Sequence, residues 1–268
     1  MTSPIKAGAA LVTGASSGIG ATYAERLARR GHDLVLVARD KARLETLAAR
    51  IAAETGAKVA ILPADLSSEA GVRAVVDRIV ADTSISMIVN NAGIGPDGPA
   101  LSSPPDYLDK MVSLNVTAVN SLTVAAANAF EARGGGTIVN IASVVALIPE
   151  RVHATYAASK AFVLALTQSL AAQTPDSGLR FQAVLPGLTR TEIFERAGVD
   201  INGLDPSMVM EVGDMVDAAL AGLDQGETVT IPSLPDPAKW DAIGGARAAI
   251  GPDLSKDKPA ARYGVGTA

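Results

Sequence analysis

The chain has 268 residues, of which 48% are hydrophobic and 19% are charged, so it can bury a large core and is neither disordered nor fibrous. Its formal net charge is −5, and its basic residues are scattered, which argues against binding to nucleic acid or to an anionic membrane. Cysteine is absent and the two histidines, His32 and His153, lie far apart, so we expect neither disulfides nor a metal centre. No apolar stretch reaches the length of a membrane-spanning helix and no signal peptide is visible, so we expect a cytoplasmic protein.

Short apolar runs alternate with segments of helical periodicity as far as about residue 231, a pattern typical of an α/β protein with a parallel sheet covered on both faces. The pattern predicts strands at 8–13, 33–38, 58–62, 86–90, 136–142, 179–185 and 227–231. It predicts helices at 18–30, 40–55, 68–81, 105–131, 155–173 and 211–223. We therefore expect one domain over 1–231, with a substrate lid at 188–210, followed by an irregular extension rich in Pro and Gly over 232–268.

A glycine-rich loop lies between the first predicted strand and the first predicted helix. Gly14, Gly18 and Gly20 permit a tight turn, close approach of a pyrophosphate, and contact between helix and strand. The helix that follows presents free N–H groups and the positive end of its dipole to phosphates. Such a cluster can also be an ordinary loop, but its position between strand and helix favours a nucleotide site.

The end of the second predicted strand indicates which dinucleotide binds. An acid there would bond the ribose 2′-hydroxyl, whereas a base would pair with a 2′-phosphate. The strand ends in Ala38 and Arg39, and the planar guanidinium of Arg39 suits a phosphate, so NADP(H) is favoured over NAD(H). The alternative is that Arg39 and Arg43 form a solvated face with Asp40 and Glu45.

Three side chains suggest acid–base chemistry. Tyr156 and Lys160 are four residues apart in a predicted helix, which puts them on one helical face. An ammonium beside a phenol stabilises the phenolate, so the pair can act as a general acid or base. Ser143 follows a strand end, where its hydroxyl can bond a substrate carbonyl. Taken alone, Tyr-x-x-x-Lys also occurs by chance on protein surfaces.

Together with the glycine loop, these residues resemble the short-chain dehydrogenase/reductase family over roughly residues 7–231. Thr13 to Gly20 is similar to the family's Thr-Gly-x-x-x-Gly-x-Gly loop, 90–93 to its Asn-Asn-Ala-Gly motif, and 186–191 to the segment that meets the nicotinamide. The resemblance implies a Rossmann-type, doubly wound sheet of seven parallel strands in the order 3-2-1-4-5-6-7, as one dinucleotide-binding catalytic domain. It implies a catalytic tetrad of Asn115, Ser143, Tyr156 and Lys160. It implies a cofactor site made of Gly14, Ser16, Ser17, Gly18, Ile19, Gly20, Arg39, Asp65, Leu66, Asn91, Ala92, Gly93, Tyr156, Lys160, Pro186, Gly187, Leu188 and Thr191.

The resemblance also implies roles for the tetrad. Ser143 and Tyr156 hold the carbonyl oxygen, Tyr156 gives it a proton, and NADPH delivers hydride to the carbon. Lys160 binds the nicotinamide ribose and lowers the pKa of Tyr156, while Asn115 holds a water that relays protons from Lys160. Family members are commonly oligomers, so a homodimer or homotetramer joined through the helices at 105–131 and 155–173 is expected.

The substrate is less defined by the sequence. The run from Val144 to Pro149 is apolar, which favours a ketone or aldehyde with an apolar body, although these residues can equally pack the loop. Arg151 and His153 precede Tyr156 and either touch a polar substrate group or lie on the surface. The alternatives to a carbonyl reductase are a catalytically silent nucleotide-binding regulatory or scaffold protein, and an epimerase or dehydratase relative.

Overall fold

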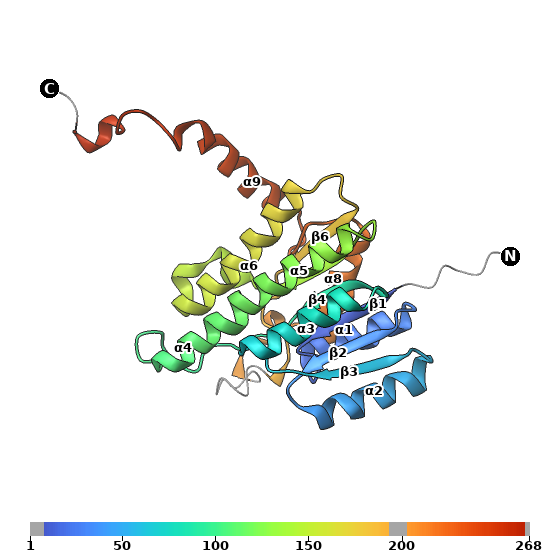
Figure 1. Ribbon diagram of the computed structural model, residues 1–268. Helices are drawn as coiled ribbons and strands as arrows, with labels where there is room; N and C mark the ends of the chain where they lie inside the picture. Colours follow the sequence, from blue (N-terminus) through green and yellow to red (C-terminus); the bar gives the residue numbers. More distant parts are fainter. Residues whose placement is uncertain (1–7, 193–202, 266–268) are drawn as a thin grey trace. The chain divides into compact units, whose positions relative to one another are not determined.

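A seven-stranded parallel sheet forms the centre of the fold (Figure 1). The computed structural model describes residues 8–192 and 203–265. The strands run in the order β3-β2-β1-β4-β5-β6-β7 and every pair is parallel, which confirms the predicted topology. Their bounds are β1 Ala9–Thr13, β2 Leu34–Ala38, β3 Val59–Pro63, β4 Ile85–Asn90, β5 Gly136–Ile141, β6 Leu179–Val184 and β7 Val229–Thr230.

Helices pack on both faces of this sheet, which explains why its strands are apolar almost without alternation. Strand β1 is buried along its whole length, and Leu11 pairs with Val35 on one side and with Ile88 on the other. Helices α1, α2 and α8 cover one face, where they bury Tyr23, Leu44 and Leu220 respectively. Helices α3 and α5 cover the opposite face. The helix bounds are α1 Gly18–Arg29, α2 Lys41–Thr55, α3 Glu69–Ala81, α4 Pro105–Val112, α5 Val119–Glu131, α6 Ala154–Gln173, α8 Val212–Asp224 and α9 Ala238–Ile250.

The helix predicted at 105–131 is interrupted. The chain forms α4, then a π-helical segment η1 over Ser113–Ala118, and then α5. Asn115 lies in this π-helical segment and is buried. A π turn shifts the hydrogen bonding by one residue, which hardly disturbs a 3.6-residue apolar pattern, so the sequence did not reveal it. Such turns are frequent at functional sites.

A buried chain of polar side chains joins the two central strands to two helices. Asn90 Nδ2 donates to Asn140 Oδ1 at 2.9 Å and to Thr123 Oγ1 at 3.1 Å. Asn140 Nδ2 donates in turn to Thr167 Oγ1 at 3.0 Å. All four side chains are buried, so these hydrogen bonds satisfy groups that water cannot reach, except Asn90 Oδ1, which has no partner among the described residues. They connect β4, β5, α5 and α6.

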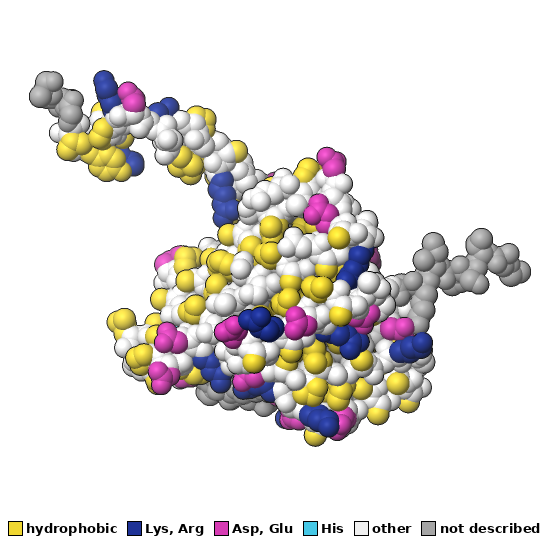
Figure 2. Space-filling view, viewed as in Figure 1, with side chains coloured by type: hydrophobic (Ala, Val, Ile, Leu, Met, Phe, Trp, Pro, Cys, Tyr) yellow, Lys and Arg dark blue, Asp and Glu magenta, His cyan; other side chains and the backbone are white. Residues whose placement is uncertain are grey.

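The surface mixes charges of both signs. Figure 2 shows Lys and Arg side chains interspersed with Asp and Glu over the face in view. Several are paired, for example Arg78 with Asp82 at 2.9 Å and Arg73 with Glu69 at 2.8 Å. Among the described residues, no helix is both long and apolar enough to cross a membrane.

The chain divides into two compact units, Met1–Pro232 and Ser233–Ala268. The second unit contains helix α9, so the extension expected to be irregular is partly helical. Its Ala-rich sequence supports a helix in spite of Gly244 and Gly245, because Ala has the highest helix propensity and offsets two glycines. Its apolar residues show no clear helical face, which is why periodicity did not predict it.

Candidate active site

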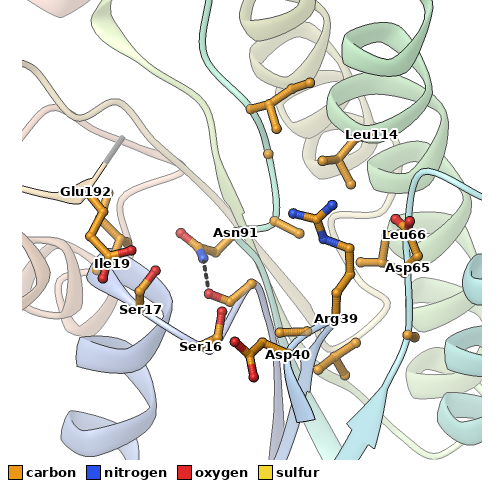
Figure 3. A pocket seen from close by; sticks show the side chains of 18 of the residues that line it. Ser16, Ser17, Ile19, Arg39, Asp40, Asp65, Leu66, Asn91, Leu114 and Glu192 are labelled. Atoms are coloured by element: carbon orange, nitrogen blue, oxygen red, sulfur yellow. Dashed lines mark hydrogen bonds between the residues drawn. The ribbon is translucent and has the colours of Figure 1, made fainter. Parts of the chain in front are cut away.

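A cavity of about 720 Å³ opens at the carboxyl ends of the first four strands (Figure 3). This edge of a doubly wound sheet is where ligands bind, and the volume suits a cofactor. Twelve residues predicted to bind the cofactor line it: Gly14, Ser16, Ser17, Gly18, Ile19, Arg39, Asp65, Leu66, Asn91, Ala92, Gly93 and Thr191. Six others predicted for the cofactor do not line it: Gly20, Tyr156, Lys160, Pro186, Gly187 and Leu188.

The glycine loop is held in shape by Asn91. Asn91 Nδ2 donates to Thr13 O at 3.0 Å. It also donates to Gly14 O at 3.2 Å (Figure 3). Gly14 has a φ of +63°, and a Cβ there would lie 2.7 Å from Asn91 Nδ2. A Cβ on Gly20 would collide with the carbonyl oxygen of Gly14. The loop therefore needs glycine at both positions, and Gly20 acts from behind the loop rather than from the cavity wall.

The first turn of α1 differs from the helices that follow it. Asp40 accepts a hydrogen bond from Arg43 N at 3.0 Å and so caps α2, and Ser68 accepts one from Gly71 N at 3.1 Å and caps α3. Within the described residues, the side chain of Ser17 makes no such bond at the start of α1. The N–H groups of that turn are thus available to an anion, and they face the cavity with the positive end of the helix dipole.

Two arginines stand at the cavity with different surroundings. Arg39 extends from the end of β2 into the cavity beside Asp65 and Leu66 (Figure 3). Hydrogen bonds from Ser67 hold the pKa of Asp65 below its ordinary value, and the charges of Arg39 and of Lys110 add to this.

Arg43, by contrast, is engaged in ion pairs. Its guanidinium lies 3.1 Å from Glu192 and 3.6 Å from Asp40. The alternative expected for Arg39 and Arg43, a solvated charged face with Asp40 and Glu45, thus holds for Arg43 and Asp40. Glu45 pairs with Lys41 instead, at 3.6 Å.

Ser143, Tyr156 and Lys160 come together at the ends of β5 and α6. Ser143 directly precedes the 3₁₀ turn η2, Val144–Leu147, and its Oγ donates to Pro186 O at 3.2 Å. The Ser143 side chain lies near enough to the Tyr156 phenol to lower the pKa of that phenol. Lys160 Nζ lies 5.7 Å from the centre of the Tyr156 ring and donates to Ile141 O at 2.9 Å. The expected one-face arrangement of Tyr156 and Lys160 is therefore present.

Burial dominates the electrostatics of this group. It raises the pKa of Tyr156 to about 12, against the opposing hydrogen bond with Ser143. Burial likewise lowers the pKa of Lys160 to about 8, because the ammonium loses its hydration. That Lys160 lowers the pKa of Tyr156 stays a prediction.

Asn115 holds the segment that follows β4. Its Oδ1 accepts from Ile94 N and its Nδ2 donates to Ile94 O, both at 2.9 Å. A Cβ on Gly93 would lie 3.1 Å from Asn115 Oδ1 and 3.8 Å from Lys160 Nζ. Gly93 thus allows Asn115 and Lys160 to approach the same stretch of backbone. A water held by Asn115 stays a prediction.

The segment after β6 meets the glycine loop at Thr191. A Cβ added to Gly18 would lie only 3.3 Å from Cγ2 of Thr191. The two described ends of the expected lid pair with each other, because Met210 N donates to Leu188 O and Arg190 N donates to Met210 O, both at 2.9 Å. The rest of the lid, residues 193–202, lies outside the described residues.

Several residues that line the cavity were not predicted from the sequence. Tyr107, Lys110 and Leu114 lie one helical turn apart before Asn115, and Ile94 and Glu192 also line the cavity. The spacing of the first three is the one signal that could have indicated a shared face toward Asn115. In the described part of the chain, no group of three His, Asp or Glu side chains is arranged to hold a metal.

A parallel seven-stranded sheet, a glycine loop before an uncapped helix, and a cavity at the strand ends define a doubly wound dinucleotide-binding protein. A family model described as short chain dehydrogenase matches residues 8–202. The chain belongs to this family of oxidoreductases, which confirms the resemblance seen in its motifs.

Solved structures agree over nearly the whole chain. A short-chain dehydrogenase from Sphingobium yanoikuyae in complex with NADPH is 49% identical, with a TM-score of 0.92 and coverage of 96% of this chain and 100% of that one. A bulky-bulky ketone specific alcohol dehydrogenase from Comamonas testosteroni is 43% identical, with a TM-score of 0.89 and coverage of 96% and 99%.

Curated relatives match more partially. The 17-beta-hydroxysteroid dehydrogenase type 3 of Homo sapiens is 33% identical over 66% of this chain and 57% of its own length. A very-long-chain 3-oxoacyl-CoA reductase of Anas platyrhynchos is 33% identical over 69% of this chain and 60% of its own length. The aligned region thus spans less than two thirds of the length of these relatives.

Proposed function

We propose that this chain uses NADP(H) to reduce a ketone or aldehyde and, in reverse, to oxidise the alcohol. One observation carries the proposal: Lys160 lies one helical turn from Tyr156 and is buried beside its ring, and the Ser143 side chain acts on the same phenol. A pair of hydroxyls aimed at one point and backed by an amine is the arrangement that carbonyl reduction needs.

The residues divide the chemistry among them. The hydroxyls of Ser143 and Tyr156 would hold the carbonyl oxygen, where negative charge develops in the transition state. Because the pKa of Tyr156 is about 12, its proton is present at neutral pH and can pass to that oxygen. Lys160, with a pKa of about 8, is mostly charged at pH 7 and would stabilise the tyrosinate left behind. The bound nicotinamide would supply hydride to the carbonyl carbon.

The cavity supports a dinucleotide with a 2′-phosphate. The glycine loop and the uncapped turn of α1 suit the pyrophosphate, and Asp65 and Leu66 flank the place for an adenine. Arg39 reaches into the cavity at the end of β2, where its guanidinium would bond the 2′-phosphate with about 1.5 to 3 kcal/mol. The Sphingobium yanoikuyae relative is in complex with NADPH, which supports this preference.

The proposed substrate has an apolar body. Val144, Val145, Ala146 and Leu147 follow Ser143 and are partly buried, so they offer an apolar surface beside the reacting hydroxyls. The Comamonas testosteroni relative is named as specific for bulky-bulky ketones, which supports a ketone with two large substituents.

We also propose that the protein is a cytoplasmic homodimer or homotetramer. Val112, Val124 and Phe162 on α4, α5 and α6 are exposed, and apolar side chains on these helices are suited to helix packing between subunits. Light scattering of the purified protein tests the oligomeric state.

Titration with NADPH and NADH, followed by assay of apolar ketones for NADPH oxidation, tests the enzymatic proposal. Tyr156→Phe keeps the ring and removes the proton, so kcat should fall by about 10²- to 10⁴-fold, with cofactor binding retained. Cofactor binding without turnover on any ketone or alcohol would favour the silent binding protein instead. The relatives above are named as dehydrogenases and reductases, and give that alternative no support.

A further inference from the structure

A histidine begins the helix that carries the reacting tyrosine. His153 is the N-cap of α6, and its Nδ1 accepts a hydrogen bond from Tyr156 N at 3.3 Å. Ser, Thr, Asp and Asn usually fill this position, because their short side chains reach the free N–H groups of the first turn. The cap bond therefore falls on the backbone of Tyr156, the residue whose hydroxyl meets the substrate in the proposed reaction.

The other ring nitrogen faces a different segment. His153 Nε2 lies 3.4 Å from Ser103 Oγ, and Ser103 Oγ lies 3.2 Å from Asp97 Oδ1. Because Nδ1 accepts from Tyr156 N–H, the neutral ring carries its proton on Nε2 and donates it to Ser103. Ser103 can then donate its own proton to Asp97 Oδ1 or to Pro99 O, both at 3.2 Å. The chain Asp97–Ser103–His153 thus ends on the helix of Tyr156.

The segment reached through Ser103 is part of the site. It begins at Ile94, which Asn115 holds by two hydrogen bonds of 2.9 Å. Its next residue, Gly95, accepts from the Tyr107 hydroxyl at 2.7 Å. Ile94 and Tyr107 line the cofactor cavity. Asn115 and Tyr107 therefore already fix segment 94–103 beside the cavity, and His153 adds a third attachment through Ser103.

We propose that His153 is a positioning residue, which fixes the first turn of α6, and with it the Tyr156 hydroxyl, against segment 94–103. Tyr156 is the third residue of α6, within the turn that frays when a cap is lost. A shift of that turn would separate the hydroxyl from Ser143, which is held independently by Pro186. This inference rests on the proposed carbonyl reduction for its kinetic consequence.

Three variants separate the two bonds of the ring. His153→Ala removes both, and His153→Asn restores a capping oxygen. Ser103→Ala leaves the cap and removes the partner of Nε2, together with the bonds of Ser103 to Asp97 and Pro99. We expect kcat of His153→Ala to fall about 10- to 100-fold, since a misplacement of 1 Å can cost that much, with KM for NADPH within about twofold. His153→Asn should recover most of kcat, and Ser103→Ala should fall between the wild type and His153→Ala.

Hydrogen exchange of the amides in the first turn of α6 gives a readout that needs no substrate. Exchange should be faster in His153→Ala and slow again in His153→Asn. If His153→Ala keeps wild-type kcat and exchange, the inference is wrong. It is also wrong if His153→Asn regains slow exchange while kcat stays as low as in His153→Ala, because the ring would then act on the substrate itself. Absence of reductase activity in the wild type would refute the proposed function, whereas the exchange result tests the cap alone.

Discussion

Replacing Lys160 with Met should make the protein more stable while it abolishes turnover. Lys160 is only 7% exposed, and Met has a similar unbranched shape and no charge to bury. Burial lowers the pKa of Lys160 from 10.5 to about 8, which corresponds to roughly 3 kcal/mol of cost for the ammonium at pH 7. The variant also loses the hydrogen bond from Nζ to Ile141 O, which costs it about 1 kcal/mol. The expected net increase in the free energy of unfolding is therefore about 2 kcal/mol.

The gain should shrink as the pH rises. Native Lys160 releases its proton above about pH 8, whereas the unfolded chain keeps its proton until about pH 10.4. Between these values the unfolded state binds more protons, so the stability of the wild type rises relative to the variant. At pH 9.5 the cost of the charge has fallen to roughly 1.5 kcal/mol, and the two proteins should be nearly equal in stability.

Urea unfolding followed by circular dichroism at pH 7 and at pH 9.5 measures both differences. Lys41→Met is the matched control, because the Lys41 side chain is 67% exposed and its loss should change stability by less than about 0.5 kcal/mol. A Lys160→Met protein that is less stable than the wild type at pH 7, or a difference that does not depend on pH, would show that the burial of this charge has been misjudged.

Three further changes test the cofactor site and the core. Gly20→Ala should push Gly14 away from the start of α1, because the new Cβ would collide with Gly14 O, with a loss of about 1 to 3 kcal/mol in stability and weaker NADPH binding; unchanged urea midpoint and Kd would contradict this. Arg39→Ala should raise the Kd for NADPH by about 10- to 100-fold and leave that for NADH nearly unchanged, and fluorescence titration giving equal losses for both would refute the role of Arg39. Tyr23 is buried and its hydroxyl has no partner among the described residues, so Tyr23→Phe should raise the free energy of unfolding by about 1 kcal/mol, and a lower urea midpoint would count against this.

The sheet could be predicted from the sequence because its strands are buried on both faces. Runs such as 8–13 and 33–38 are apolar nearly throughout and are separated by clear helical segments, so their identity did not depend on tertiary contacts. The order of the strands came from the resemblance in motifs, not from periodicity. The strand predicted at 227–231 is reduced to Val229–Thr230, since pairing at the sheet edge, rather than local sequence, decides where such a strand ends.

Features that depend on geometry between distant segments were not predictable. The π turn around Asn115 preserves the apolar pattern that would have revealed it. The pair Arg43–Glu192 joins residues far apart in the chain, and neither carries a local signal for the other. His153 was left open between a substrate contact and a surface position, because histidine is an uncommon N-cap and the position of Ser103 beside it follows only from the fold.

The pKa values of Tyr156 and Lys160 could not be predicted from the sequence. The spacing of Tyr156 and Lys160 indicated that they share a face, but a pKa reflects desolvation as well as neighbouring charge. The depth of burial, which raises the pKa of Tyr156 and lowers that of Lys160, is a property of the packed protein.

The buried polar chain beneath the site has a consequence for how new substrate preferences can arise. Asn140 lies on β5, three residues before Ser143, which follows the end of that strand, and Thr167 lies seven residues after Lys160 on α6. Their hydrogen bond is directional, so sliding α6 along β5 by even one residue, about 1.5 Å, would break it and leave buried groups without partners. Apolar packing alone would tolerate such a slip more readily. The alignment of Ser143 with Tyr156 is thus encoded in side chains that never meet the substrate, and the loops that do meet it are free to change in sequence without disturbing the chemistry.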